Sequence, residues 1–298
     1  MPVDKKQGLV ARQTLSAEEL TAIKQLTAIC EDYERLYMRL SWGMLQTRSG
    51  KQAEDFLYYV DNQLVGYLAM DGHGTETREL VGMVHPDHRR EGIFRTLLTA
   101  AQTECQRHGV QRLVLICEHS SRSGKAFVEA IKANYDTSEH EMILEHFRER
   151  AAFDDRLVLR PADDSDVEGL VTIVQSDGLS EEEARRWVKR VLSEPISQTY
   201  IATFGVEGVS CGEPIGTLRV DNWDELAGIY GFVVLPAYRG RGYGRQMLEE
   251  VIRSIRATSQ KTIMLDVDTN NINAIGLYRS CGFAIKTTYD YYVINIGN

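Results

Sequence analysis

The sequence predicts a mixed α/β fold of the α+β type, in two tandem domains that each carry a mostly antiparallel sheet with flanking helices. The first observation is a strand, a basic turn and a helix that occur twice, with Arg89 and Gly92 matched 150 residues later by Arg239 and Gly242. A repeat of this size indicates two homologous domains. The second observation is that both halves run through the same order of apolar strands and amphipathic helices. We therefore expect domains over residues 1–150 and 151–298, each of ordinary size.

In the first half, alternating apolar residues predict strands and a 3.6-residue apolar period predicts helices. The hairpin is a clear local signal, because Asp61-Asn-Gln63 joins two apolar segments. The expected strands are Leu9–Gln13, Asp55–Val60, Leu64–Met70, Glu76–Val84, Gln111–Cys117 and one or two strands over Tyr135–Glu145. The expected helices are Ala17–Ile29, Tyr33–Ser41, Gly92–His108 and Gly124–Ala133.

A charged segment, Glu145–Arg156, is the expected linker, and the same order then restarts. Ser180 followed by three glutamates is typical of a helix N-terminus. The expected strands are Leu157–Arg160, Thr199–Phe204, Ile215–Val220, Ala227–Val234, Thr262–Val267, Ala284–Thr288 and Tyr291–Ile296. The expected helices are Val167–Gln175, Ser180–Leu192, Arg241–Ala257 and Asn273–Ser280.

The composition describes an acidic globular protein. With 43% hydrophobic and 26% charged residues, the 298-residue chain can bury two cores, and its net charge of −9 argues against broad binding to nucleic acid or anionic membranes. No apolar run approaches the length of a membrane span, and the N-terminus lacks a signal-peptide core. The five cysteines, without a Cys-x-x-Cys pair, indicate reduced thiols, so we expect a cytoplasmic protein. No cluster has metal-ligand spacing, and no metal is expected.

A glycine-rich turn in the second half, Arg239-Gly-Arg-Gly242-Tyr-Gly244, carries the most informative chemistry. It follows an apolar strand and opens an amphipathic helix, so backbone N–H groups and a helix N-terminus converge, which suits a pyrophosphate. A tight turn that needs glycine for its backbone angles would also explain the pattern. A Rossmann site needs a third glycine where Arg245 stands, and the lysine of a P-loop is absent.

The pattern Arg/Gln-x-x-Gly-x-Gly/Ala after such a strand resembles the acetyl-CoA signature of the GNAT N-acetyltransferases. Residues 239–244 match it at every fixed position. Downstream, Asn271-x-x-Ala274-x-x-Leu-Tyr278-x-x-x-Gly282-Phe is similar to the family's next block, in the right order and at the right spacing. The resemblance covers most of residues 156–298. It implies the fold of that family, acetyl-CoA as the cofactor and transfer of an acetyl group to an amine.

The resemblance also implies which residues hold acetyl-CoA. Asn271 would help to hold the pantetheine arm, although capping of the following helix would also explain it. The full set of implied cofactor contacts is Val233, Val234, Arg239, Gly240, Arg241, Gly242, Tyr243, Gly244, Arg245, Asn271, Ala274 and Tyr278.

Two residues of the second half are candidates for proton transfer. Tyr278 matches the tyrosine that protonates the departing thiolate in the family, and a buried helix aromatic is the structural alternative. Asp266 occupies the place where some members carry a glutamate that accepts the proton of the amine, and a solvent-facing strand carboxylate is the alternative. Glu225 and Tyr230 are other candidate bases or water-positioning groups. Cys281 lies on the helix face of Tyr278 and reads as a small buried thiol.

The first half is a weaker copy of the same pattern. Ile116 stands where the second half has Asp266, and Val128 where it has Tyr278, so catalysis is not expected there. A large side chain, Phe94, replaces the third small residue of the turn and either crowds a pyrophosphate or points away from it. The residues of a possible second CoA site are Val84, Arg89, Arg90, Gly92, Ile93 and Phe94.

The sequence therefore predicts a tandem GNAT-type N-acetyltransferase whose second half acetylates an amine of a small molecule or peptide. Two alternatives stay open: a non-catalytic acyl-CoA sensor, and a transferase of the same fold that uses aminoacyl-tRNA. No nucleic-acid or membrane partner is expected. The doubled chain already supplies a pseudo-dimer, so a monomer is expected rather than a homodimer.

Overall fold

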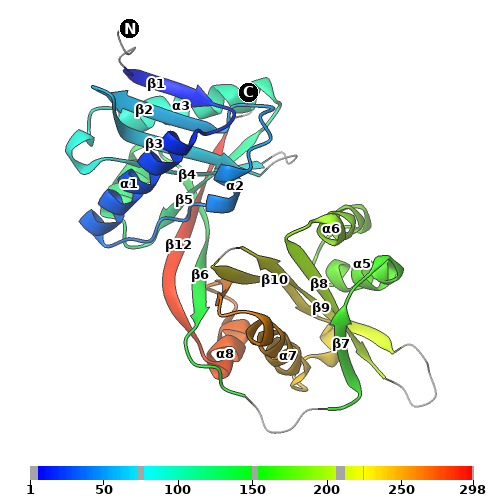
Figure 1. Ribbon diagram of the computed structural model, residues 1–298. Helices are drawn as coiled ribbons and strands as arrows, with labels where there is room; N and C mark the ends of the chain where they lie inside the picture. The colour runs from blue at the N-terminus through cyan, green and yellow to red at the C-terminus, as the bar shows by residue number, and fades with distance from the viewer. Residues whose placement is uncertain (1–5, 73–76, 150–153, 206–211, 224, 297–298) are drawn as a thin grey trace. The chain divides into compact units, whose positions relative to one another are not determined.

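A computed structural model describes residues 6–72, 77–149, 154–205, 212–223 and 225–296. The chain divides into two compact units, the first comprising Met1–Glu139 with Thr287–Asn298 and the second His140–Lys286. Each unit has a mostly antiparallel sheet with helices on its faces (Figure 1), which confirms the expected fold class. The expected domains, 1–150 and 151–298, follow the sequence repeat. The units are defined by spatial contacts, and these place Thr287–Asn298 with the first unit. Among the described residues, no helix is both long and apolar enough to cross a membrane.

The first unit has the sheet order β1-β2-β3-β4-β5-β12-β6, in which β4 and β5 are parallel. Its strands are β1 (Gly8–Arg12), β2 (Asp55–Val60), β3 (Gln63–Asp71), β4 (Thr77–Val84), β5 (Arg112–Glu118), the start of β6 (Asn134–Leu144) and most of β12 (Phe283–Asn295). Its helices are α1 (Ala17–Glu34), α2 (Trp42–Gln46), α3 (Ile93–Arg107) and α4 (Arg122–Ala130). Asp61 and Asn62, both with positive φ, form the expected turn between β2 and β3.

The second unit has the order β6-β11-β10-β9-β8-β7, in which β10 and β11 are parallel. Its strands are β7 (Leu157–Pro161), β8 (Ser197–Phe204), β9 (Glu213–Asn222), β10 (Leu226–Val234), β11 (Thr262–Asp268) and the end of β6. Its helices are α5 (Val167–Gln175), α6 (Glu181–Ser193), α7 (Tyr243–Thr258) and α8 (Ile272–Cys281). A capping box between Ser180 and Glu183 starts α6, as its sequence predicts.

Two local expectations were wrong. The apolar spacing over Tyr33–Ser41 predicted a helix, but α1 ends at Glu34 and Arg35 takes the left-handed conformation. The separate strands Ala284–Thr288 and Tyr291–Ile296 are one strand, β12. Its residues Tyr289–Asn295 pair with β5 of the first unit. The sequence did not predict this pairing, because period-two alternation indicates which face of a strand is buried and not which strand it pairs with.

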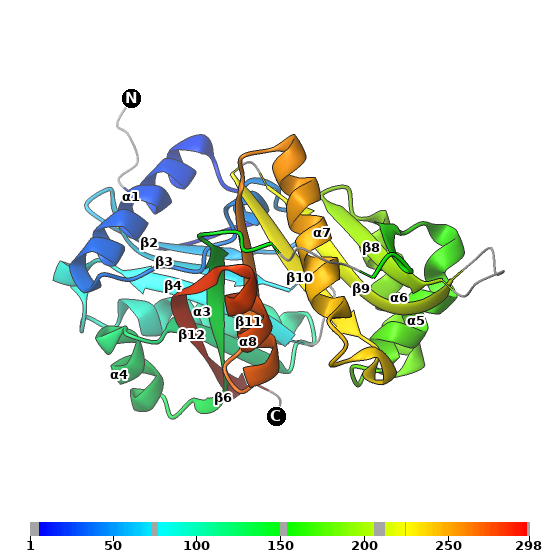
Figure 2. The ribbon, with the colours of Figure 1, turned by 90° about the horizontal axis from the view of Figure 1, so that it is seen from below.

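Each sheet buries both faces. In the first unit, α3 covers a core with Leu68 and Leu97, and α1 covers another with Ile23 and Tyr67. In the second unit, α7 and α8 cover one face and α5 and α6 the other (Figure 2). Burial of each large apolar side chain contributes ~1.5–3 kcal/mol, so these four helix–sheet contacts stabilise the units. The four cysteines that lie in the described residues are free and buried, and Cys211 lies outside them.

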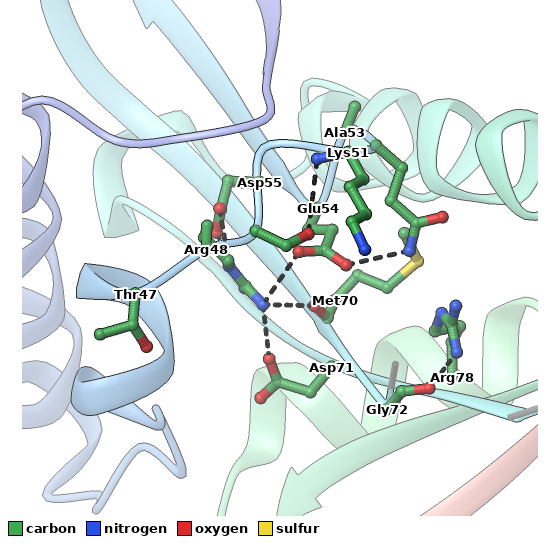
Figure 3. Close-up of polar contacts among 12 residues, drawn as sticks. Thr47, Arg48, Lys51, Ala53, Glu54, Asp55, Met70, Asp71, Gly72 and Arg78 are labelled. Atoms are coloured by element: carbon green, nitrogen blue, oxygen red, sulfur yellow. Dashed lines mark hydrogen bonds and ion pairs between the residues drawn. The ribbon is translucent and has the colours of Figure 1, made fainter. Parts of the chain in front are cut away.

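A buried polar cluster fixes the segment between α2 and β2 (Figure 3). The guanidinium of Arg48 forms two hydrogen bonds to Asp55, at 2.9 and 3.1 Å, and others to the carbonyl of Met70 and to Asp71. Tyr67 donates a hydrogen bond of 2.6 Å to the same Asp55 carboxylate. Burial raises the pKa of Asp55, and its hydrogen bonds with Arg48 and Tyr67 oppose that shift. We interpret the cluster as structural, since its donors and acceptors form hydrogen bonds with one another.

Candidate active site

An opening between two parallel strands creates the candidate site of the second unit. Strands β10 and β11 pair over four residues, from Leu226↔Thr262 to Ile229↔Leu265, and separate beyond that point. The following residues of β10 up to Val234 pair only with β9 on their other side. The edge of β10 that faces β11 therefore leaves backbone N–H and C=O groups for an extended ligand. Val233 and Val234, two of the residues expected to contact the cofactor, lie on this segment.

A β-bulge interrupts β10 at the opening. The register with β9 shifts between Tyr230 and Val233, so one extra residue is inserted there. Gly231 has φ +56°, a conformation in which glycine is favoured, and a Cβ at this position would lie 3.1 Å from two ring atoms of Trp187. Bulges redirect backbone groups out of the ladder. The bulge therefore leaves N–H groups near the point where β10 and β11 separate.

The loop after β10 has the geometry of an anion site. Gly242, with φ +89°, precedes α7, whose first-turn N–H groups have no intrahelical acceptor. A Cβ added at Gly240 or Gly242 would meet nothing within 4 Å, so the space over the loop is open. Arg239 donates through Nε to the carbonyl of Val234 at 2.7 Å, and no carboxylate among the described residues pairs with it. Its terminal nitrogens are therefore left for an external anion.

The other loop residues divide into cationic and packed side chains. Arg241 lies 5.7 Å from the centre of the Tyr238 ring and forms no ion pair within the described chain. The guanidinium of Arg245 instead contacts Glu249, Ser280 and the carbonyl of Arg148. Tyr243 is buried and packs against Phe204. At positions 243 and 245 only the backbone N–H is therefore available to an anion.

Helix α8 begins at Asn271 beside this opening. The Asn271 side chain accepts a hydrogen bond of 3.1 Å from the N–H of Ala274, so it caps the helix. Asn271 is exposed, and its side-chain amide nitrogen takes no part in this cap. Both the structural and the ligand-binding role that the sequence suggested are compatible with this position.

Tyr278 lies on α8 between two aromatic rings, Phe232 at 6.4 Å and Phe283 at 6.1 Å between centroids. Its side chain is 7% exposed, and its hydroxyl makes no hydrogen bond with the described residues. Burial, with a smaller effect of Cys281, raises the pKa of Tyr278 to about 12. The phenol is thus protonated at neutral pH and free to donate to a ligand atom.

The candidate bases lie on the opposite face of the sheet. Ile229 and Leu265 point into the core under α7, so strand alternation places Tyr230 and Asp266 on the face of α5 and α6. These are the first residues beyond the paired part of β10 and β11. Asp266 is half-buried, whereas Glu225 is exposed at the other end of β10. The acid candidate Tyr278 and the base candidate Asp266 therefore reach the opening from opposite faces.

An aromatic and charged group beside Tyr230 was missed from the sequence. The guanidinium of Arg219 lies 5.5 Å from the Tyr230 ring and 5.9 Å from the Trp187 ring, and it pairs with Asp221 at 2.8 Å. Trp223 packs edge-to-face on Tyr230. These side chains line the α5–α6 face of the opening. A glycine inside an apolar strand, Gly231, was the available signal for a bulge at this place.

The first unit repeats the opening without the bulge. Strands β4 and β5 pair from Thr77↔Arg112 to Leu80↔Leu115 and then separate, and β3–β4 keeps an unbroken register. A pocket of about 470 Å³ lies in this opening. Arg89, Arg90, Gly92, Ile93, Phe94 and Val84, the residues of the possible second CoA site, all line it. Ile116 and Val128 also line it, at the places of Asp266 and Tyr278.

The structure resolves the orientation of Phe94. Its ring packs edge-to-face on Phe127, with 4.6 Å between centroids, and a Cβ added at Gly82 would lie 2.9 Å from it. In the second unit, Phe232 on β10 lies near Gly244 on α7. The aromatic ring thus comes from the helix in one unit and from the strand in the other.

Other reactive groups do not join the site. Cys281 is fully buried, and burial raises the pKa of its thiol, so it is a poor nucleophile. Within the described ranges, no three His, Cys, Asp or Glu side chains are grouped as metal ligands.

The family model for acetyltransferases of the GNAT type matches residues 19–130 and 170–283. The chain therefore belongs to the acetyltransferase (GNAT) family, as an enzyme with two tandem family domains. Among known proteins it is similar to mycothiol acetyltransferase of Corynebacterium efficiens, with 26% identity over 288 residues that cover 92% of this chain and 89% of the relative.

Two solved structures share the fold over nearly the whole chain. A GCN5-related N-acetyltransferase from Sphaerobacter thermophilus has a TM-score of 0.78 and 20% identity, covering 97% of this chain and 96% of that one. A tandem GNAT protein from the clavulanic acid biosynthesis pathway has a TM-score of 0.70 and 17% identity, covering 97% and 98%. These likenesses confirm the tandem architecture.

Proposed function

We propose that the second unit transfers an acetyl group from acetyl-CoA to the amine of a small molecule or peptide. The observation that carries this proposal is the bulged opening of β10 next to an unpaired Arg239 loop, with Tyr278 on one face and Asp266 on the other. The first unit has the opening but neither the bulge nor these two side chains. Acetyl-CoA would supply the activated thioester for the reaction in the second unit.

The cofactor contacts follow from the geometry of the loop. The N–H groups at the start of α7 and the terminal nitrogens of Arg239 and Arg241 favour a pyrophosphate. The open edge of β10 at Val233 and Val234 offers hydrogen bonds to the amides of a pantetheine arm. Open space over Gly240 and Gly242 lets the phosphates approach the backbone. These groups would hold and orient the cofactor.

The chemistry requires a proton acceptor and a proton donor. An amine attacks only in its neutral form, and Asp266 or a water beside it accepts the proton on the α5–α6 face. A backbone N–H at the bulge stabilises the negative charge that develops on the carbonyl oxygen. Tyr278 donates its proton to the departing thiolate from the other face. Its pKa of about 12 keeps that proton available at neutral pH.

The acceptor would approach along Trp187, Arg219 and Tyr230, which line the α5–α6 face. The similarity to mycothiol acetyltransferase supports a small-molecule acceptor. Aromatic faces and a hydrogen-bonding Arg–Asp pair suit a polar molecule of modest size. A cytoplasmic location is part of the same proposal.

Calorimetric titration with acetyl-CoA, followed by an assay of free thiol release with a panel of amines, tests the proposal. We expect tight binding to the second unit and acceptor-dependent release of CoA. A folded sample that binds no acetyl-CoA would contradict the proposal. Dependence of the reaction on charged tRNA would instead favour the aminoacyl transferase.

The base is tested by a matched pair of variants, Asp266→Asn and Glu225→Gln. We expect Asp266→Asn to lower kcat about 100-fold with acetyl-CoA affinity unchanged, because a positioned base contributes ~10²–10⁴-fold. Glu225→Gln, which removes the same charge from the other end of β10, should leave kcat near its original value. The opposite result would assign the base to Glu225.

A further inference from the structure

The pocket of the first unit lies where a ligand would bind, and the carboxylate of Glu34 lies beside it. Its walls come from β4, β5, α4 and the loop before α3, the elements that correspond to the proposed cofactor site of the second unit. Gly92 has φ +83°, close to that of Gly242, so the backbone of the loop is preserved. Arg90 and Arg95 line the mouth without an ion pair among the described residues.

Glu34, at the end of α1, binds the cation of this loop. Its carboxylate forms an ion pair with Arg89, whose Nε also donates to the carbonyl of Val84 at 3.1 Å. The other carboxylate oxygen accepts a hydrogen bond of 3.0 Å from Ser121 and lies 3.5 Å from the N–H of Ser123. Glu34 thus connects the loop to the N-terminus of α4, across two elements that line the pocket.

The environment keeps this carboxylate charged. The Glu34 side chain is only 6% exposed. Burial acts to raise its pKa, but hydrogen bonds from Ser123 and Ser121 and the charge of Arg89 lower that pKa overall. Glu34 is thus an anion held by a guanidinium and a helix N-terminus, which are the groups that bind a phosphate.

Among the described residues of the second unit, no carboxylate takes the place of Glu34. Arg239 makes the same Nε hydrogen bond to its strand carbonyl as Arg89, but its terminal nitrogens have no carboxylate partner in the described chain. Position 184, which is 150 residues after Glu34, is a buried alanine. The two loops therefore share a backbone and differ in whether the arginine is already neutralised.

We propose that Glu34 is an internal competitor for the phosphate of a CoA-type ligand in the first-unit pocket: by occupying Arg89 in place of that phosphate, it sets the affinity of the pocket. This inference rests on the proposed use of acetyl-CoA by the second unit. A ligand must displace Glu34 from Arg89 to gain that contact. Binding to the first unit is therefore weaker than binding to the second, and it strengthens when the carboxylate is neutralised.

The test measures first-unit binding in isolation, in the full chain carrying Gly242→Glu to block the second unit. Titrations with CoA and with pantetheine, which has no phosphate, compare this background with and without Glu34→Gln. We expect Glu34→Gln to strengthen CoA binding at least about 10-fold, since the ligand's phosphate no longer has to displace a carboxylate from Arg89, and hydrogen bonds to charged groups are stronger than those between neutral groups. Pantetheine affinity should change less than about twofold. Glu91→Gln, which removes a charge from the same loop without contacting Arg89, is the matched control and should have no effect.

Three results would overturn the proposal: unchanged CoA affinity in Glu34→Gln, equal strengthening for pantetheine and CoA, or an equal effect of Glu91→Gln. Thermal melting verifies that each variant is folded, and Glu34→Ala provides a second neutral variant if Glu34→Gln is unstable. Failure of the cofactor proposal is separate, because it shows as absent binding to the chain with Gly242 intact.

Discussion

The loops after β4 and β10 have nearly the same backbone conformation, but their arginines have different partners. Arg90 and Gly240 have φ values of +70° and +76°, and Gly92 and Gly242 have +83° and +89°. A non-glycine residue in that conformation is strained by ~1 kcal/mol, so Arg90 carries a cost that Gly240 avoids. In the first unit Glu34 neutralises Arg89, and in the second Arg239 is left for an external anion. A repeated motif can therefore preserve its conformation while its binding groups are reassigned.

The strands before these loops differ in a second way. Strand β10 contains one residue more than β4, and the bulge at Gly231 accommodates it. In β4, Gly82 packs tightly instead, since a Cβ there would lie 2.6 Å from the carbonyl oxygen of Tyr67. Phe232 lies within this bulge, and its ring is near Gly244 on α7. The bulge and the two proposed proton-transfer residues, Tyr278 and Asp266, occur in the same unit, which supports the proposal that this unit is catalytic.

The largest expected effect comes from Gly242→Glu. The new carboxylate would stand against the pyrophosphate, and the side chain would be strained at φ +89°. We expect acetyl-CoA binding to the second unit to weaken about 1,000-fold, equivalent to ~4 kcal/mol, as measured by calorimetry. The matched variant Gly92→Glu should leave turnover within about twofold, because the proposed catalysis takes place in the second unit. Equal losses in both variants would remove the functional difference between the two loops.

The next effect concerns stability rather than binding. Phe94→Gly removes a partly buried ring that packs on Gly82 and Phe127. We expect the free energy of unfolding to fall by about 3 kcal/mol, as for other large-to-small core changes, in urea denaturation. Unchanged stability, with stronger CoA binding to the first unit, would show that Phe94 obstructs the ligand and is not part of the core.

Tyr278→Phe tests the proposed acid role of Tyr278, for which the first unit has no counterpart. The ring keeps its packing, so acetyl-CoA affinity should hold while kcat falls about 10- to 100-fold. Because burial raises the pKa of Tyr278 to about 12, the phenol stays protonated, and the ratio of wild-type to variant kcat should be constant between about pH 7 and 9. Tyr238→Phe, which loses a hydrogen bond to Glu213 in the nearby loop, is the control. A variant with undiminished kcat would exclude the acid role.

The fold was predictable from the sequence because hydrophobic periodicity and turn residues are local signals. The glycine-rich loop and Tyr278 were proposed as site residues from short motifs, which are also local signals. Glu34 was not, because nothing local distinguishes it from other helix glutamates and its partners lie 55 and 87 residues away. The apolar spacing over Tyr33–Ser41 misled for a related reason. It suits one helix face, yet Tyr33 and Tyr37 are exposed while Leu36 and Leu40 are buried in a non-helical segment.

The smallest effect is expected for Gly244→Ala. This variant tests whether the loop needs glycine here for its backbone conformation or to leave space for the cofactor. Gly244 lies in the first turn of α7 without a positive φ, and an added Cβ would make ordinary contacts of 3.5–3.6 Å with Val234, Leu277 and Phe232. Since glycine inside a helix is destabilising by ~0.5–1 kcal/mol relative to alanine, we expect a slight gain in stability in urea denaturation. Acetyl-CoA affinity should stay within about twofold. A large loss of affinity would mean that the cofactor approaches this Cα directly, and that the cofactor site of the second unit extends from Gly242 into the helix.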